Sequence, residues 1–156
     1  MQLPSAHRAL DPRVSMDPVA LVTKTLALTD AVVGGLKLFQ IVLEAPAEIA
    51  SLINDMSDLQ VVFKEVHSAL QQHHDATNHS LLGLNLLLGR AKEKLLQLDQ
   101  IIQYCTPSGP EGKVQALQKT AARFRWVRGK PRVGKLQKDL LEIKLGLAAM
   151  WGAANS

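Results

Sequence analysis

Apolar residues in the segment from Val19 to Leu43 lie on nearly all sides of the helix that this segment would form. Asp17 is a suitable N-cap, and Pro18 suits the first helical position, where its missing N–H costs nothing. The polar residues fall mainly on a narrow stripe at every seventh position, namely Thr23, Asp30, Lys37 and Glu44. A helix with so little polar surface belongs in the centre of a helical bundle or in a lipid bilayer.

Three later segments carry apolar residues at alternating steps of three and four, the spacing of one buried helix face. The first row, after the break at Glu44-Ala45-Pro46, consists of Ile49, Leu52, Met56, Leu59, Phe63, Val66 and Leu70. The second consists of Leu81, Leu84, Leu88, Ala91, Leu95, Leu98 and Ile102, and the third of Val133, Leu136, Leu140, Ile143, Leu147 and Met150. The polar stretches 73–79 and 106–112 are predicted loops.

A shorter helix, marked by Val114, Leu117, Ala121 and Phe124, precedes the last one, and we expect the segment from Arg128 to Pro131 to separate the two. The sequence therefore predicts an all-α fold, an antiparallel bundle of four long helices plus one short helix. With 156 residues, 47% of them hydrophobic, the chain suits one domain with a real core. We expect a flexible leader over residues 1–15, the bundle over 16–151 and a frayed tail over 152–156.

The charge is distributed unevenly along the chain. Residues 1–112 carry 8 Lys and Arg against 12 Asp and Glu, whereas residues 113–156 carry 10 against 2. Basic residues mixed with aromatic ones suit an anionic membrane surface, and they also suit nucleic acid or a merely solvated helix face. The residues that we select as a candidate anionic-surface site are Arg123, Arg125, Trp126, Arg128, Lys130, Arg132 and Lys135.

No motif in the sequence predicts an enzyme, a cofactor site or a metal site. The histidines His67, His73, His74 and His79 lack the ordered spacing of metal ligands, and three of them fall in a predicted loop. The chain has no Gly-rich phosphate loop and no nucleophile motif. Its one cysteine, Cys105, rules out an internal disulfide and favours a reducing, cytoplasmic location.

The segment from Val19 to Leu43 is long enough to cross a bilayer, but Lys24, Asp30 and Lys37 interrupt it. We expect it to be a core helix in the resting protein and to be compatible with conditional recruitment to a membrane. The glycine pair Gly34-Gly35 costs about 1 kcal/mol per residue relative to alanine, which points to a packing or hinge role. The candidate membrane-insertion residues are Val19, Val22, Leu26, Val33, Leu36, Phe39 and Leu43.

Four stretches of the sequence resemble a known family. They are the start Met16-Asp17-Pro18-Val19-Ala20, the junction Glu44-Ala45-Pro46-Ala47-Glu48-Ile49, the helix Leu52-Ile53-Asn54-Asp55-Met56-Ser57-Asp58-Leu59, and the basic Arg123-Phe124-Arg125-Trp126 before the last helix. Together they look like the HeLo-like domain, the fungal N-terminal domain of STAND proteins. The resemblance covers about residues 16–150, although 15 residues precede Met16 and no NTPase domain or amyloid motif follows. We therefore expect a fragment, a stand-alone paralogue or a truncated product.

This resemblance implies a signalling or effector module of fungal immunity, heterokaryon incompatibility or programmed cell death. Related HeLo domains oligomerise and permeabilise membranes, with the first helix implicated in insertion, so residues 19–43 would be the executing element. The implied partners are further copies of the chain, partner helices of the same family and anionic membrane lipids. The alternative is a purely protein–protein interaction or oligomerisation domain without membrane activity. A nucleic-acid role ranks third, and an enzyme ranks last.

Overall fold

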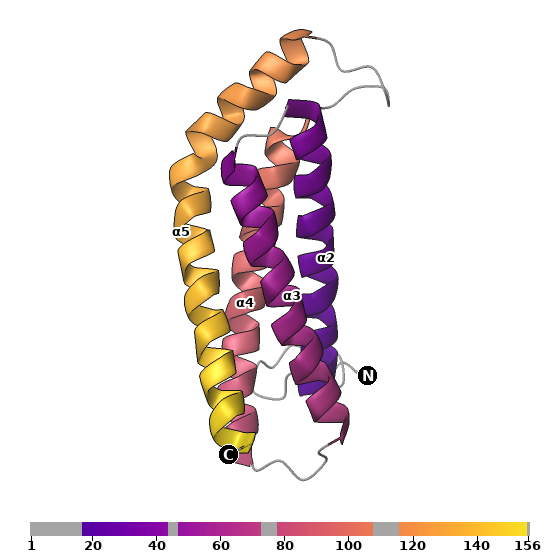
Figure 1. The fold of residues 1–156 in the computed structure, drawn as a ribbon, viewed down its shortest axis with the longest axis vertical. Coiled ribbons are helices and arrows are strands. Elements are labelled where there is room, and N and C mark those ends of the chain that lie inside the picture. The colour runs from indigo at the N-terminus through magenta and orange to yellow at the C-terminus, as the bar shows by residue number, and fades with distance from the viewer. Residues whose placement is uncertain (1–16, 44–46, 73–77, 108–115, 156) are drawn as a thin grey trace, which may run out of the picture.

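The structure is a computed structural model that describes residues 17–43, 47–72, 78–107 and 116–155. These residues form four helices and no strand (Figure 1). The helices are α2 (Pro18–Leu43), α3 (Ala47–Gln72), α4 (Asn78–Cys105) and α5 (Ala116–Asn155). The all-α prediction is confirmed, whereas the prediction of four long helices plus one short helix is wrong. The predicted leader lies outside the described residues.

One continuous helix, α5, replaces the short and the long helix that the sequence predicted. It passes through Pro131, which is exposed, so the proline ring faces solvent. Proline has no N–H to donate within the helix. Figure 1 shows that α5 bends in its N-terminal half, as a proline inside a helix favours. The helix also continues over 152–155, which we expected to fray, and the alanines at 153 and 154 favour this extension.

The register of the first turns of α5 also differs from the prediction. Leu117 and Phe124 were expected to face the core, but both are exposed, and Ala122 and Trp126 are buried instead. The reason is that the row beginning at Val133 continues backward along the same face without a break. Helix α4 likewise begins earlier than expected, so that residues 78 and 79 belong to a helix and not to a loop.

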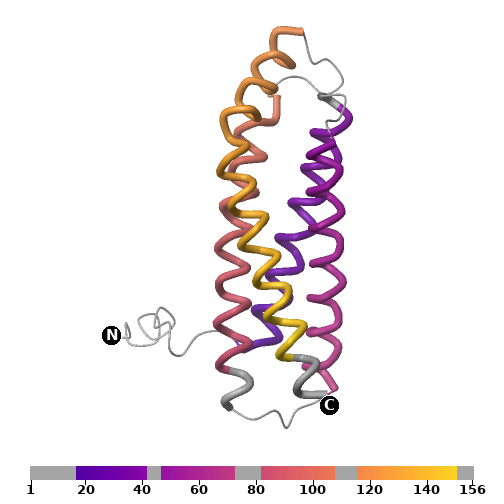
Figure 2. Tube along the Cα trace, turned by 60° about the vertical axis from the view of Figure 1, so that its left-hand side comes forward, coloured from indigo at the N-terminus to yellow at the C-terminus, as the bar shows by residue number. Residues whose placement is uncertain are grey.

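The helices are arranged so that α2 packs broadly against both α3 and α4, while α5 packs against α4 and, less extensively, against α3. Helices α3 and α4 follow each other in the chain but barely touch, and they lie diagonally across the bundle, as α2 and α5 do (Figures 1 and 2). The pairs α2/α3 and α4/α5 are antiparallel, whereas α2/α4 and α3/α5 run in parallel. In this arrangement α2 has extensive packing contacts with two helices, α3 and α4.

The predicted apolar rows form the core. All seven members of the α3 row are buried, as are the α4 row from Leu84 to Ile102 and the α5 row from Val133 to Leu147. The largest fully buried side chains include Phe39 of α2 and Phe63 of α3. The spacing of apolar residues was therefore a reliable guide to the buried faces of three helices.

The two adjacent glycines of α2 differ in their surroundings, and this predicts opposite effects of alanine. A Cβ atom at Gly34 would meet no atom within 4 Å, whereas one at Gly35 would lie 3.0 Å from Cγ2 of Ile102 on α4. We expect Gly34→Ala to raise the free energy of unfolding by about 0.5–1 kcal/mol, because alanine loses less backbone entropy in a helix.

Gly35→Ala should fail to give this gain or should destabilise the protein, since Ile102 must move to admit the new methyl group. Urea denaturation followed by circular dichroism measures both effects. Equal gains from the two variants would show that α2 and α4 do not approach closely at Gly35.

Candidate functional site

The inner face of α2 lies in the core. Val22, Leu36 and Phe39 are fully buried, Val33 is 6% exposed, and the buried row also includes two threonines. The hydroxyl of Thr25 donates to the carbonyl of Leu21 at 2.6 Å, and that of Thr29 donates to the carbonyl of Thr25 at 2.7 Å. Because both buried hydroxyls donate to carbonyls of their own helix, they need no hydrogen-bond partner on the neighbouring helices.

Polar contacts between α2 and the rest of the bundle are correspondingly few. Across the described ranges, one side-chain hydrogen bond joins α2 to another helix, from Nε2 of Gln60 on α3 to Oδ1 of Asp30. Apolar packing therefore holds α2 in place, with one polar contact near its middle. A helix held in this way can leave its neighbours at little hydrogen-bond cost.

The candidate insertion residues are mostly on this inner face. Val22, Val33, Leu36 and Phe39 are core residues, and Val19 and Leu26 are partly buried against the core. The side chain of Leu43 lies outside the described residues. In the folded bundle these residues are thus turned away from any membrane.

The outer face of α2 carries a largely apolar row beside the polar stripe of Thr23, Asp30 and Lys37, which is also exposed. A row at steps of four and three is exposed along the whole helix, and its members are Ala20, Lys24, Ala27, Ala31, Gly34, Leu38 and Ile41. Lys24 is the one charged member of this row. The segment Pro18–Ile41 is long and apolar enough to cross a membrane by length and composition, a criterion that the core helix of a soluble bundle also meets.

Most of the candidate anionic-surface residues are on the surface of α5. Arg123, Arg128, Arg132 and Lys135 are exposed. Nζ of Lys130 lies 2.9 Å from Oε1 of Glu48 on α3. The guanidinium carbon of Arg125 lies 5.6 Å from the centre of the Tyr104 ring, a cation–π contact with α4.

Trp126 does not belong to this surface, and its selection as a surface residue is corrected here. Its side chain is only 4% exposed, and its ring centre lies 5.2 Å from that of Phe39 at an interplanar angle of 59°. The position is seven residues before Val133, on the same inward row. Its indole N–H has no hydrogen-bond partner among the described residues.

The exposed apolar side chains near the basic residues are Leu117, Phe124 and Val127. Sequence reasoning treated Leu117 and Phe124 as core and did not select Val127. Extending the Val133 row backward by seven residues would have placed Trp126 inside the bundle and these three outside. The basic surface of α5 therefore has an apolar component different from the one predicted.

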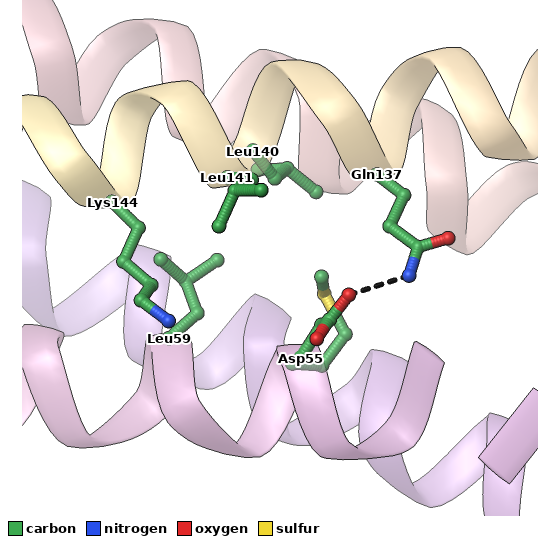
Figure 3. Close-up of a pocket in the computed structure, with 7 residues that line it drawn as sticks. Asp55, Leu59, Gln137, Leu140, Leu141 and Lys144 are labelled. Atoms are coloured by element: carbon green, nitrogen blue, oxygen red, sulfur yellow. Dashed lines mark hydrogen bonds between the residues drawn. The ribbon is translucent and has the colours of Figure 1, made fainter. Parts of the chain in front are cut away.

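Polar pairs tie α5 to α3 at intervals of seven residues along α5. Besides the pair of Lys130 with Glu48, Nε2 of Gln137 donates to Oδ2 of Asp55 at 2.5 Å. Nζ of Lys144 lies 3.9 Å from Oδ2 of Asp58. Figure 3 shows the amide of Gln137 directed at the carboxylate of Asp55. The α3–α5 contact therefore includes three polar pairs besides its apolar packing, whereas a single polar side-chain contact joins α2 to the other described helices.

A small cavity lies beside these pairs, between α3 and α5 (Figure 3). Its volume is about 10 Å³, enough for about one water molecule. The lining residues are Asp55, Met56, Leu59, Gln137, Leu140, Leu141 and Lys144. A cavity of this size holds no organic substrate or cofactor.

The described residues contain no group of three or more histidines, cysteines or carboxylates that could hold a metal ion. His73 and His74, and the side chain of His79, lie outside the described part of the chain. Cys105 is buried, and burial raises the pKa of its thiol, an effect that the nearby Arg125 opposes. A protonated, buried thiol is a poor nucleophile.

Comparison with known proteins finds no matching family model, no matching curated protein and no matching solved structure. The HeLo-like resemblance consequently rests on the residues quoted above and stays a prediction. The two distinctive surfaces of the described part of the chain are α2 and the N-terminal half of α5.

Proposed function

We propose that this protein is a helical signalling or effector module that self-associates and targets or permeabilises membranes through α2. The observation that carries the proposal is that α2 carries an exposed, largely apolar row in addition to its buried face, over a length that can cross a bilayer. An ordinary amphipathic bundle helix turns a polar face to water. The exposed face of α2 instead combines alanine, glycine, leucine and isoleucine with four polar residues, Thr23, Lys24, Asp30 and Lys37.

The energetic demands of transfer to lipid are small for most of α2. Its hydroxyls are satisfied within the helix, and the aliphatic stems of Lys24 and Lys37 allow their ammonium groups to reach the headgroups. Asp30, near the middle, is the main opposing group, since a central aspartate costs about 2.5–3.5 kcal/mol on insertion. In the folded bundle this carboxylate accepts a hydrogen bond from the amide of Gln60.

Self-association is supported by the small residues of the exposed row. Ala27 and Ala31 are four residues apart and Gly34 follows on the same face, a spacing that lets two helix backbones approach closely in lipid. The resemblance to the HeLo-like family, most of whose residues lie outside α2, implies the same function. Copies of this chain are therefore the proposed partners, together with anionic lipids, and the cytoplasm is the proposed resting location.

The alternative is an interaction domain whose helices pair with partner helices in water and never meet lipid. It is favoured by the same exposed row, because its steps of three and four match the seam of a coiled coil. The two proposals differ in whether α2 must leave the bundle. A reversible cross-link between α2 and α4 tests that difference directly.

Gly35 and Ile102 are the natural positions for this cross-link. A Cβ atom at Gly35 would lie 3.0 Å from Cγ2 of Ile102, which is one bond beyond the Ile102 Cβ, so the two Cβ atoms are within reach of the disulfide Cβ–Cβ distance of roughly 3.5–4.5 Å. The variant is Gly35→Cys with Ile102→Cys, and Cys105→Ala removes the native thiol. We expect the oxidised protein to release little dye from vesicles of phosphatidylcholine and phosphatidylserine, and reduction to restore release.

The matched control carries Ile102→Cys and Cys105→Ala alone and should respond to neither oxidant nor reductant. Equal leakage from the locked and the reduced protein would contradict insertion of α2. If oligomers form but neither state causes leakage or floats with vesicles, the interaction-domain alternative replaces the membrane proposal.

A further inference from the structure

The N-terminal half of α5 carries a row of apolar side chains that the bundle leaves uncovered. Leu117, Phe124 and Val127 are 80%, 64% and 61% exposed, respectively. At 100° per residue they point to one side of the helix, opposite the buried Ala122 and Trp126. Figures 1 and 2 show the first turns of α5 reaching past the ends of the other helices. We call these three residues the α5 outer strip.

Positive charges border the α5 outer strip on both edges. Arg123 lies one helical turn before Val127 on one edge, and Arg128 lies one turn after Phe124 on the other. Lys135 and Lys138 continue along the outside of the helix and are also exposed. No acidic residue occurs in the sequence from position 112 to position 138.

These charges are not neutralised within the bundle. In the described part of α5 up to position 138, the one ion pair is that of Lys130 with Glu48. Arg123, Arg128, Lys135 and Lys138 have no carboxylate within ion-pair distance among the described residues. The basic surface is thus available to an anionic partner.

An apolar strip with cations along both edges has the geometry of a helix that lies in the plane of a membrane interface. The ring of Phe124 can enter the acyl region while the guanidinium groups on each side contact lipid phosphates. At the same end of the bundle, Tyr104 is exposed, and its amphipathic ring suits headgroup depth. Nucleic acid fits this surface less well, because the apolar strip would press against phosphates.

We propose that the α5 outer strip and its bordering arginines dock the folded bundle onto an anionic phospholipid surface. The inference rests on the proposed membrane role but concerns another helix and an earlier step, since α5 can dock while α2 is still in the core. Docking by α5 uses side chains that are already exposed and requires no unfolding. Release of α2 would then occur next to the bilayer that receives it.

The test is sedimentation of the full chain with vesicles of phosphatidylcholine containing phosphatidylserine, and with phosphatidylcholine vesicles alone. We expect binding to the anionic vesicles that weakens as salt rises. The double variant Arg123→Gln and Arg128→Gln should bind about 30-fold more weakly. Phe124→Ser should bind about 10-fold more weakly.

The matched control, Lys64→Gln with Arg90→Gln, removes the same charge from exposed positions on α3 and α4 and should bind within about 3-fold of the native chain. Equal losses from both double variants would overturn the proposal, because net charge alone would then explain binding. An unchanged affinity of Phe124→Ser would also overturn it. Duplex DNA that binds more tightly than the vesicles would assign the surface to nucleic acid.

The disulfide-locked protein separates this inference from the proposed function. If docking by α5 is correct, the oxidised Gly35→Cys, Ile102→Cys protein binds anionic vesicles as well as the reduced form does, whether or not either form causes leakage. Loss of binding on oxidation would overturn docking by the folded bundle. Binding without leakage from the reduced protein would contradict the role of α2 and leave the α5 surface intact.

Discussion

Trp126→Ala is expected to lower the free energy of unfolding by about 3–5 kcal/mol, the usual cost of emptying a buried aromatic site. The Trp126 ring is buried and packs against Phe39, which is fully buried on α2. This contact joins α2 and α5, which lie diagonally across the bundle and otherwise touch little. Since small domains are stable by only about 5–15 kcal/mol, the loss is a large part of the total.

A double-mutant cycle with Phe39→Ala tests the ring contact itself. We expect the double variant to lose about 0.5–1.5 kcal/mol less stability than the sum of the two single variants, which is the range for aromatic pairs. Urea denaturation followed by circular dichroism gives all four values. The control is Phe124→Ala, which removes an aromatic ring that is 64% exposed and should change stability by about 0.5 kcal/mol or less. A loss from Trp126→Ala no larger than that of the control would contradict burial of the indole.

Aspartate substitutions on the two faces of α2 should have very different effects on folding. Val33→Asp places a carboxylate in the core, where burial without a partner costs several kcal/mol, so we expect this variant to be largely unfolded. Ala31→Asp lies on the exposed face and should cost about 1 kcal/mol or less, mainly through helix propensity. Circular dichroism and thermal melting distinguish the two outcomes.

Ala31→Asp is therefore the variant that tests insertion without loss of the fold. In a bilayer the added aspartate lies near the centre of α2 and costs about 2.5–3.5 kcal/mol, so vesicle leakage should fall strongly. Ala148→Asp makes the same change on the exposed side of α5 and should leave leakage near the native level. Native leakage from folded Ala31→Asp would argue that α2 does not enter the membrane.

Ala31 and Val33 of α2 show which part of the candidate site the sequence predicts and which part it leaves open. The apolar character of α2 is evident from residues 19–43 alone. Which of its residues face the core depends on where α3 and α4 lie, because a helix apolar on nearly all sides has no periodicity that selects one face. Ala31 and Val33 are equally compatible with burial in the sequence and are separated only by the packing.

The sequence by itself determined the helices α3 and α4, the C-terminal half of α5 and their buried rows, since apolar residues at steps of three and four can be buried together only on one helix face. It also determined the basic character of α5. Only the tertiary structure decided that α5 continues through Pro131, because an exposed proline can be accommodated where packing on α4 holds both sides of the bend. The same packing places Trp126 against Phe39 and leaves Phe124 exposed to solvent. The reason is that the buried face marked by the Val133 row continues toward the N-terminus of α5, which fixes the side of the helix that meets solvent.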